Sequence, residues 1–369
     1  MLYYIPLIFF TCLSIIELMY ADKKIGNTWL VCIAIVLIVF AGFRTVGPDL
    51  SEYTNYFNSS SIRSVLQAQG IEPAFLEINK FVRDNDWPIF IMFFIVSIFG
   101  VIPKMVFIKK YTVYVFPALV VYYTTIFIIK EMGQIRHGVA IAFALMAFGL
   151  MAQKRIGWSL VFTLIALQFH YSAICVLPAY FFVNKEISAK RMLLIIAALF
   201  PLVLFDLKPL LTQIVQILPV ESAKSKGTFY LNSPMYGFSV GLDSSVVLRL
   251  IVLGVMLYYQ KTLTERVPYF KAFLNLYFIG ICYYLLFSSV SEFAQRTSVY
   301  YRTLEIAILP GFITLGKTLG DKLLIGLVIA LNGVYTLVKL LENPLGKEMY
   351  DRYDNMLFEW IVDFIHVIG

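Results

Sequence analysis

The apolar run IGWSLVFTLIALQFHYSAICVLPAYFFV, residues 156–183, contains a polar interruption at Gln168–Ser172. Its 28 residues would measure about 42 Å as one helix. The hydrocarbon core of a bilayer is only about 30 Å thick. The run therefore forms either one long crossing or two short crossings that meet near His170. The side of the membrane on which every later loop lies depends on this choice.

The composition of the whole chain is that of an integral membrane protein. Of the 369 residues, 60% are hydrophobic and 14% are charged, and the mean hydropathy is +0.80. An average soluble domain has about 25% charged residues. At roughly 20 residues per crossing, the chain has room for about a dozen spans and one or two longer loops, but not for a sizeable soluble domain.

Ten other apolar runs predict helices. The first lacks the positively charged start and the small-residue cleavage site of a signal peptide, so we expect a retained helix. The runs are residues 2–19, 29–43, 88–108, 112–129, 138–152, 192–205, 246–260, 270–288, 304–315 and 323–341.

The distribution of charge favours two crossings within residues 156–183. Short cytoplasmic loops collect Lys and Arg, and two crossings place six short loops on one side: residues 20–28, 103–111, 153–155, 184–191, 260–271 and 317–322. These loops hold 15 of the 30 basic residues and four acids, a net charge of +11, whereas the rest of the chain has a net charge of −4. We therefore predict an all-α, polytopic protein, a single transmembrane domain over residues 1–369 with about twelve transmembrane helices and both termini outside.

Arginine is distributed differently from lysine. Only three of the eleven arginines lie in the six basic loops, and eight lie elsewhere. A guanidinium can hold phosphate or carboxylate with two parallel hydrogen bonds, which an ammonium cannot do. The outer face is therefore a candidate anion site. The basic residues form no stripe, so we expect no nucleic-acid partner.

Two outer loops are long enough to carry function. In residues 44–87, the apolar side chains of Ile71, Phe75, Ile78 and Val82 predict an amphipathic helix at the membrane surface. The second loop, residues 206–245, opens with a similar stretch and continues with a polar segment that we expect to be mobile.

Arg44 and Asp49 flank a Gly-Pro turn at the end of an apolar helix. Arg44 could simply complement the helix dipole, and Asp49, folded back toward it, could be its ion-pair partner or a catalytic carboxylate. Arg136 begins another helix, where a cation is disfavoured, so either a bound anion offsets this cost or the side chain reaches to the interface.

Three further groups are candidates. His170 could be a general base or a phosphate ligand, or a buried histidine satisfied by a neighbouring helix. Arg296 and Arg302 enclose Tyr300 near the mouth of the eleventh span, where an aromatic belt is the simpler interpretation. Asp84-Asn85-Asp86 has a D-x-D form, but two acids in a polar turn are common. The four cysteines lie in apolar runs without metal-ligand spacing, so we expect no metal site.

The order of these motifs resembles the EpsG-type family of bacterial exopolysaccharide polymerases, which is similar in role to the Wzy O-antigen polymerases. Five pieces carry the resemblance: Arg44-x-x-Gly47-x-Asp49-x-x-x-Tyr53-x-x-Tyr56-Phe57, Glu72-Pro73-Ala74-Phe75, Gln134-x-Arg136-His137-Gly138, His170-Tyr171-Ser172-Ala173, and Arg296 followed by Tyr300-Tyr301.

The resemblance implies a GT-C-like glycosyltransferase in the bacterial cytoplasmic (inner) membrane, with its active site facing the periplasm or outside. It would join undecaprenyl-diphosphate-linked repeat units, using a lipid-linked donor and acceptor, with no cofactor and no metal. A chain-length regulator and a flippase are the expected partners besides membrane lipid. A glycan ligase that uses the same donor and a lipid-linked oligosaccharide flippase or transporter are the alternatives.

The resemblance also suggests roles for single residues. Asp49 is the first candidate for the base that takes the acceptor proton, followed by His170 and Glu72. Arginines would hold the donor diphosphate by preorganised electrostatics. The full set of candidate substrate-binding residues is Arg44, Arg136, Arg296, Arg302, Tyr53, His137 and Tyr300.

Overall fold

A computed structural model describes residues 2–20, 26–59, 70–217, 221–234, 236–241, 243–350 and 353–357. These residues are helical apart from turns, loops and one isolated bridge between Arg44 and Asn355. The first half contains α1 (Tyr4–Met19), α2 (Asn27–Gly42), α3 (Leu50–Asn58), α5 (Pro73–Asp84), α6 (Ile89–Tyr111), α7 (Val115–Tyr122), the π-helix η1 (Tyr123–Glu131), α8 (Ile135–Ala152) and α9 (Ile156–Phe169).

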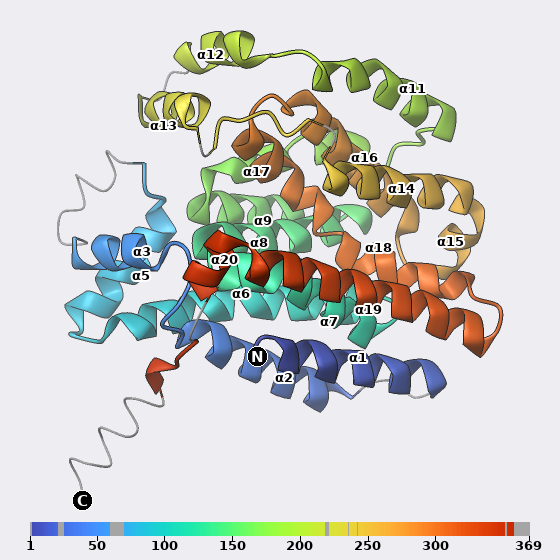
Figure 1. Cartoon of the computed structure of the whole chain (residues 1–369), viewed down its shortest axis with the longest axis horizontal. Helices are drawn as coiled ribbons and strands as arrows, with labels where there is room; N and C mark the ends of the chain where they lie inside the picture. The colour runs from blue at the N-terminus through green and yellow to red at the C-terminus, as the bar shows by residue number, and fades with distance from the viewer. Residues whose placement is uncertain are drawn as a thin grey trace, which may run out of the picture.

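The second half is built from shorter pieces. They are η2 (Tyr171–Val176), α10 (Ala179–Phe182), α11 (Ala189–Leu199), η3 (Phe200–Val203), α12 (Lys208–Gln216), α13 (Glu221–Asn232), α14 (Ser244–Tyr258), α15 (Gln260–Arg266), α16 (Phe270–Leu286), α17 (Ser291–Arg302), α18 (Glu305–Phe312), η4 (Ile313–Leu315), α19 (Leu319–Glu342) and α20 (Pro344–Tyr350). In Figure 1 the longer helices run side by side across the picture, with α3, α5 and α13 toward one end and α15 toward the other.

The apolar run of residues 156–183 makes two passes, as the charge distribution predicts. Helix α9 ends at Phe169, and His170 has an extended backbone (φ −159°, ψ 120°). The chain then returns to the end at which α9 starts. A hydrogen bond shows this: the Asn184 side-chain amide donates to the carbonyl oxygen of Met151, just before α9, at 2.9 Å. The chain therefore turns back near His170, as two short crossings would require.

The basic loops gather at one end of the bundle. The ammonium of Lys110 donates to the side chain of Gln153 at 3.3 Å, and Lys109 donates to Asn27. The guanidinium of Arg266 donates to the carbonyl oxygen of Thr314. We call this end, formed by residues 153–155, 184–191, 260–271 and 316–322, the basic end. The opposite end, where α3 and α5 lie, is the site end.

The prediction of a loop at residues 103–111 is wrong. Helix α6 continues through Pro103 to Tyr111, and Lys104 is fully buried in it. The Lys104 ammonium forms an ion pair with Glu131 and donates to the carbonyl oxygens of Gly100 (3.1 Å) and Gly138 (2.8 Å). A charge count cannot distinguish a buried, paired lysine from one in a loop.

The structure is that of a helical membrane protein. Each of the twelve predicted apolar segments coincides with a helical segment. Among the described residues, α6, α8 and α19 are long and apolar enough to span a bilayer, and the number rises to five if each of two bent helix pairs is one span. Six further apolar helices have only 10–17 residues.

Both long loops contain helices that pack on the bundle. The predicted amphipathic helix is α5, which buries Phe75 and Val82, while Ile78 is half-buried. Helix α3, which precedes it, was not expected. In the second loop, α12 matches the predicted amphipathic stretch, and the polar segment after it forms α13.

Candidate functional site

The loop after α2 is seated on the turn between η1 and α8. Gly47 has φ +132°, and a Cβ atom there would lie 2.3 Å from the carbonyl oxygen of Met132. A Cβ atom on Gly133 would in turn lie 3.1 Å from the ring of Pro48. Only glycine permits such close approach of two backbones. The Gly-Pro turn therefore brings Asp49 to the first turn of α8.

Asp49 does not pair with Arg44, although the sequence left that possibility open. No described residue forms a hydrogen bond or ion pair with the carboxylate of Asp49. Burial and the nearby charge of Glu52 raise its pKa above the usual value, while the positive charges of Arg136, Arg296 and Lys130 oppose this. The carboxylate is half-buried, unpaired and within the field of three cations.

Arg44 lies beneath the loop. Its side chain is fully buried, its Nη1 donates to the carbonyl oxygen of Ala41 at 2.7 Å, and its Cζ lies 4.8 Å from the centre of the Phe93 ring. Burial lowers the pKa of Arg44 to about 10. Nε and Nη2 have no hydrogen-bond partner. The Arg44 side chain therefore lies beneath the surface of the site, and its role in substrate binding stays a prediction.

Glu72 and Arg136 form a buried ion pair. Arg136 Nη1 donates to Glu72 Oε2 at 2.5 Å, and the side chains are 14% and 3% exposed. The other carboxylate oxygen accepts the backbone N–H of Tyr171 at 3.4 Å. The guanidinium also lies 5.5 Å from the centre of the Tyr56 ring and 5.9 Å from that of Tyr53. Glu72 thus fixes Arg136 in place and ties it to the turn after α9.

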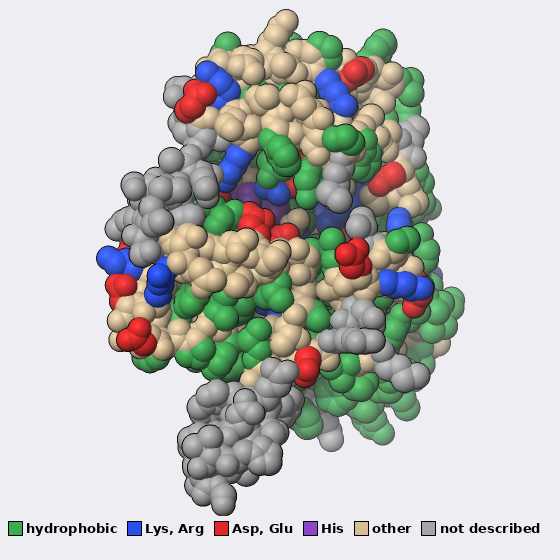
Figure 2. Space-filling view, turned by 60° about the vertical axis from the view of Figure 1, so that its left-hand side comes forward, with side chains coloured by type: hydrophobic (Ala, Val, Ile, Leu, Met, Phe, Trp, Pro, Cys, Tyr) green, Lys and Arg blue, Asp and Glu red, His purple; other side chains and the backbone are tan. Residues whose placement is uncertain are grey.

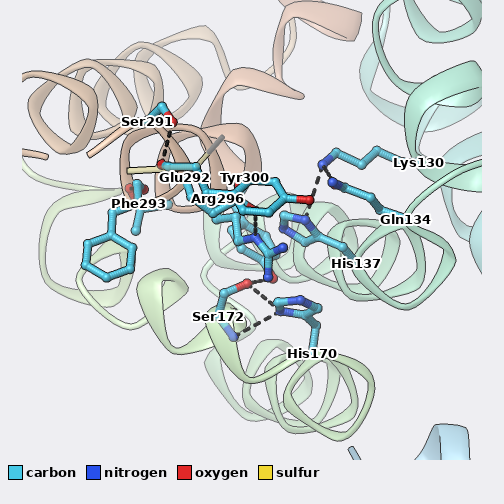
Figure 3. A network of polar contacts seen from close by, with 12 residues as sticks. Lys130, Gln134, His137, His170, Ser172, Ser291, Glu292, Phe293, Arg296 and Tyr300 are labelled. Carbon is cyan, nitrogen blue, oxygen red and sulfur yellow. Dashed lines mark hydrogen bonds and ion pairs between the residues drawn. The ribbon is translucent and has the colours of Figure 1, made fainter. Parts of the chain in front are cut away.

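Two histidines stack at the centre of the site. The rings of His137 and His170 have centroids 4.6 Å apart and an interplanar angle of 25°. His137 Nδ1 lies 3.2 Å from the ammonium of Lys130, which also donates to Gln134. The ring of Tyr300 lies 5.2 Å from that of His137. Figure 3 shows these side chains converging from η1, α8, α17 and the turn before η2.

The hydrogen bonds of His170 determine which ring nitrogen carries the proton. The backbone N–H of Ser172 donates to His170 Nδ1 at 3.2 Å, and the Ser172 hydroxyl lies 2.7 Å from the same atom and 2.8 Å from the Tyr300 hydroxyl. Because a backbone N–H can only donate, Nδ1 is an acceptor. The neutral ring therefore carries its proton on Nε2, where it can donate to an anion but cannot accept a proton.

Arg296 is held from α17. Its Nε donates to Glu292 one turn earlier, and its Cζ lies 4.8 Å from the centre of the Tyr230 ring. Its side chain is 26% exposed. The charge of Arg296 repels the ammonium of Lys130, whereas Glu292 and Asp49 attract it. Arg296 therefore belongs to the same electrostatic group as Asp49 and Lys130.

Arg302 lies in a different environment from Arg136 and Arg296. Its charge is repelled by Arg249 and attracted by Glu305. Glu305 in turn accepts the hydroxyl of Tyr277 at 2.8 Å. The structure thus brings together eight of the predicted residues, Asp49, Tyr53, Glu72, Arg136, His137, His170, Arg296 and Tyr300. Arg44 is buried beneath this group, and Arg302 lies at its edge, where its charge also repels the ammonium of Lys130.

The site also contains residues that the sequence interpretation missed. Lys130 and Gln134 precede His137 by seven and three residues, and Glu292 precedes Arg296 by four. The spacing of four residues on α17 could have indicated contact, whereas Lys130 and His137 lie on either side of the turn between η1 and α8. Tyr230 and Lys226 come from α13, and the Lys226 ammonium donates to the carbonyl oxygen of Gly70 at 2.8 Å. No local pattern relates α13 to the site.

Figure 2 views the site end and shows a hollow in which histidine side chains are visible, with basic and acidic side chains around it. Among the described residues, no three His, Cys, Asp or Glu side chains come close enough together to hold a metal ion. Asp84-Asn85-Asp86 forms an exposed turn at the end of α5, in which Asp86 has φ 55°.

Comparison with known proteins places most of the chain in one family. The sequence pattern of the EpsG family matches residues 27–353. The chain is 27% identical over 277 residues to the Amylovoran biosynthesis protein AmsC of Erwinia amylovora, and the match covers 70% of this chain and 72% of that protein. No solved structure was found to match. All five motifs quoted above lie inside the matched range.

Proposed function

The chain belongs to the EpsG family, and from this premise we propose that it is a polysaccharide polymerase. It would join undecaprenyl-diphosphate-linked repeat units into an exopolysaccharide or O-antigen at the outer face of the bacterial cytoplasmic membrane. The similarity to an amylovoran biosynthesis protein supports a role in polysaccharide synthesis. The observation that carries the proposal is the carboxylate of Asp49, which no described residue pairs and whose pKa is lowered by the charges of Arg136, Arg296 and Lys130 from three separate helices.

The proposed reaction is a single glycosyl transfer. The hydroxyl of the acceptor sugar attacks the anomeric carbon of the donor, a new C–O bond forms, and the bond from that carbon to the diphosphate breaks. The proton of the hydroxyl passes to the base, and undecaprenyl diphosphate leaves. A base needs a free lone pair and a pKa closer to neutrality than an exposed carboxylate has. Asp49 meets both requirements, whereas Glu72 is paired with Arg136 and His170 Nδ1 is already an acceptor.

The cations would stabilise the departing diphosphate. Arg136 and Arg296 each bond one acid, which fixes the guanidinium and leaves other N–H groups for a ligand. The Nε2–H of His170 and the ammonium of Lys130 add two further donors. Preorganised donors directed at developing negative charge are usually the largest single contribution to such catalysis. Tyr230, which is half-buried, would border the sugar or prenyl chain, while the buried Tyr53 and Tyr300 would support the cations from behind.

The orientation follows from the charge of the basic end. Cytoplasmic loops collect Lys and Arg, so we propose that the basic end faces the cytoplasm and the site end faces the periplasm or outside. Twelve crossings with a GT-C-like arrangement remain the proposed architecture, with several crossings made by the short apolar helices. A chain-length regulator and a flippase remain proposed partners.

The test is polymerisation by the purified protein. The protein in detergent is incubated with a synthetic polyprenyl-diphosphate-linked repeat unit, without nucleotide sugar, and the products are separated by size. We expect a ladder of dimers and longer products. Asp84→Asn, at an exposed position away from the site, is the matched control for Asp49→Asn. Movement of the lipid across a bilayer without new glycosidic bonds would indicate a transporter, and transfer of glycan only to a different lipid acceptor would indicate a ligase.

A further inference from the structure

A cavity lies at the basic end, far from the hollow of the candidate site. It has a volume of about 530 Å³ and is lined by Lys154 before α9, by the loop between α10 and α11, and by the first turns of α11, α15 and α16. Its basic side chains are Lys154, Lys185, Arg191 and Lys271. Helix α8 begins at the site and ends at Ala152, next to this cavity. Its 18 residues span about 27 Å, so the two regions are separate.

The charges that line the cavity are unbalanced. Four basic side chains face one acid, Glu186. All five are exposed, and no described residue forms an ion pair or side-chain hydrogen bond with any of the four cations. Like charges that converge on one cavity repel one another. An anion within the cavity would relieve this repulsion.

The walls of the cavity are fixed by hydrogen bonds. The side-chain amide of Asn275 donates to the carbonyl oxygens of Phe182 (3.0 Å), Val183 (3.2 Å) and Lys185 (2.8 Å). The amide of Asn184 donates to the carbonyl oxygen of Met151. The loop that carries Lys185 is therefore anchored to α16 and to the end of α8. Such anchoring fixes the backbone from which the Lys185 side chain extends.

Helix α11 adds a second reason to expect an anion. Its N-terminus lies at the cavity, where Ser188 caps it by accepting the backbone N–H of Arg191. Lys190 and Arg191 occupy its first turn, where the helix dipole disfavours cations. A bound anion would reverse this cost and accept the free N–H groups of the first turn.

The surface beside the cavity is apolar. Trp158 is 65% exposed, Phe181 is 70% exposed and Leu194 is 59% exposed. Each lies within about one helical turn of a residue that lines or borders the cavity. The cavity therefore combines a charged interior with an exposed apolar border, which suits a ligand with a phosphate and hydrocarbon chains.

We propose that this cavity binds the phosphate-bearing headgroup of an anionic phospholipid in the leaflet at the basic end. Basic pockets between membrane helices bind such headgroups elsewhere. A soluble phosphate compound shares the phosphate but would make no use of the apolar border. The proposal does not depend on the polymerase activity, because it concerns the opposite end of the molecule.

The test measures lipid binding to the full-length protein. Purified protein in neutral detergent is titrated with phosphatidylglycerol or phosphatidylcholine, and bound lipid is counted by native mass spectrometry. The cavity variant is Lys185→Gln with Lys271→Gln. The matched control is Lys317→Gln with Lys322→Gln, which removes the same charge from another loop of the basic end. We expect phosphatidylglycerol to be preferred by roughly tenfold or more, the cavity variant to lose most of this preference, and the control to keep it.

Two results would overturn the proposal. One is equal binding of both lipids, or equal loss of preference in the cavity variant and the control, which would leave only a diffuse surface charge. The other is displacement of the bound lipid by millimolar inorganic phosphate, which would assign the cavity to a soluble phosphate compound. Polymerisation is measured on the same preparations, so failure of this proposal is distinguishable from failure of the proposed function.

Discussion

Both ends of helices α8 and α9 are rich in cations, but they hold these cations differently. At the site end, Arg136 pairs with Glu72 and Arg296 pairs with Glu292, and each guanidinium lies against a tyrosine ring. At the basic end, Lys154, Lys185, Arg191 and Lys271 are exposed, and the described residues provide them with no acidic partner.

The difference separates charge used for orientation from charge used for chemistry. A count of basic residues treats both ends alike. A cation that is fixed by an acid and an aromatic ring has a defined position and can stabilise a transition state without reorganisation. A free surface lysine has no such position, but it does bias the loop toward the cytoplasm. Pairing and burial, rather than charge, therefore mark the candidate catalytic end.

The largest effect at the site end is expected for Asp49→Asn. The amide keeps the shape of the carboxylate but cannot take the acceptor proton, and loss of a general base typically costs about 10²- to 10⁴-fold in rate. Turnover should fall by this amount while affinity for the lipid-linked donor stays near that of the wild type. Rate is measured by product formation and affinity by equilibrium binding, with Asp84→Asn as the control.

A fall in donor affinity that matches the fall in rate would show that Asp49 only holds the arginines. His170→Gln is measured in parallel. If Asp49→Asn remains active and His170→Gln does not, the base is the histidine and the assignment of Asp49 is wrong.

The next largest effect is on the stability of the fold, at the buried ion pair between Lys104 and Glu131. Lys104→Met leaves Glu131 buried without its partner, and breaking one side of a buried ion pair costs about 3–5 kcal/mol. Lys109→Met on the same helix removes an exposed lysine that donates only to Asn27, and it should change stability by less than about 1 kcal/mol. Denaturant-induced unfolding in detergent measures both. Equal stability of the two variants would mean that Lys104 is not paired as the structure has it.

A smaller effect is expected for Arg136→Lys and Arg296→Lys. Each change keeps the charge but loses the planar fork that holds an acid and that would hold the proposed donor phosphate. Polymerisation should fall by roughly tenfold or more for each variant, equivalent to about 1.4 kcal/mol. Arg155→Lys, at the exposed start of α9 on the basic end, should be nearly neutral. If all three variants are tolerated alike, the arginines of the site end do not hold the donor.

The smallest effect is a shift in the pH profile. Burial raises the pKa of Asp49, and the charge of Arg136 lowers it. A base acts only when deprotonated, so the rate should fall as the pH drops through this raised pKa. Arg136→Gln removes a positive charge, and the acidic limb of its residual activity should move to higher pH. An acidic limb that persists unchanged in Asp49→Asn would belong to another group.

Local sequence patterns predicted the positions of the helices and which loops lie at the same end of the bundle. The polar residues around His170 indicated the break in the run of residues 156–183, and apolar spacing indicated α5. The charge count placed the basic loops on one side, which the contact between Asn184 and Met151 supports. Helix positions and breaks depend on neighbouring residues, and the side on which basic loops lie depends on the membrane. Both could therefore be predicted from the sequence alone.

Long-range packing determined what the sequence could not. Arg44 and Arg136 both lie at an end of an apolar helix, so their sequence contexts are similar. The fold nevertheless buries Arg44 against Phe93, whereas it pairs Arg136 with Glu72. Lys104 follows Pro103 and precedes two further lysines, which suggested a loop. It is instead buried in α6 as an ion pair with Glu131. Tyr230 reaches the site because α13 folds over α17, and no spacing in the sequence encodes that contact.

Photocrosslinking of the donor tests most directly which end of the molecule carries the chemistry. A polyprenyl-diphosphate-linked repeat unit with a diazirine on the sugar next to the diphosphate is irradiated with the purified protein, and labelled peptides are identified. We expect labelling of α3, the start of α8 and α17, and loss of this labelling when unmodified donor is added in excess. Labelling confined to α11 and α15 at the basic end, with the site end unlabelled, would contradict this expectation.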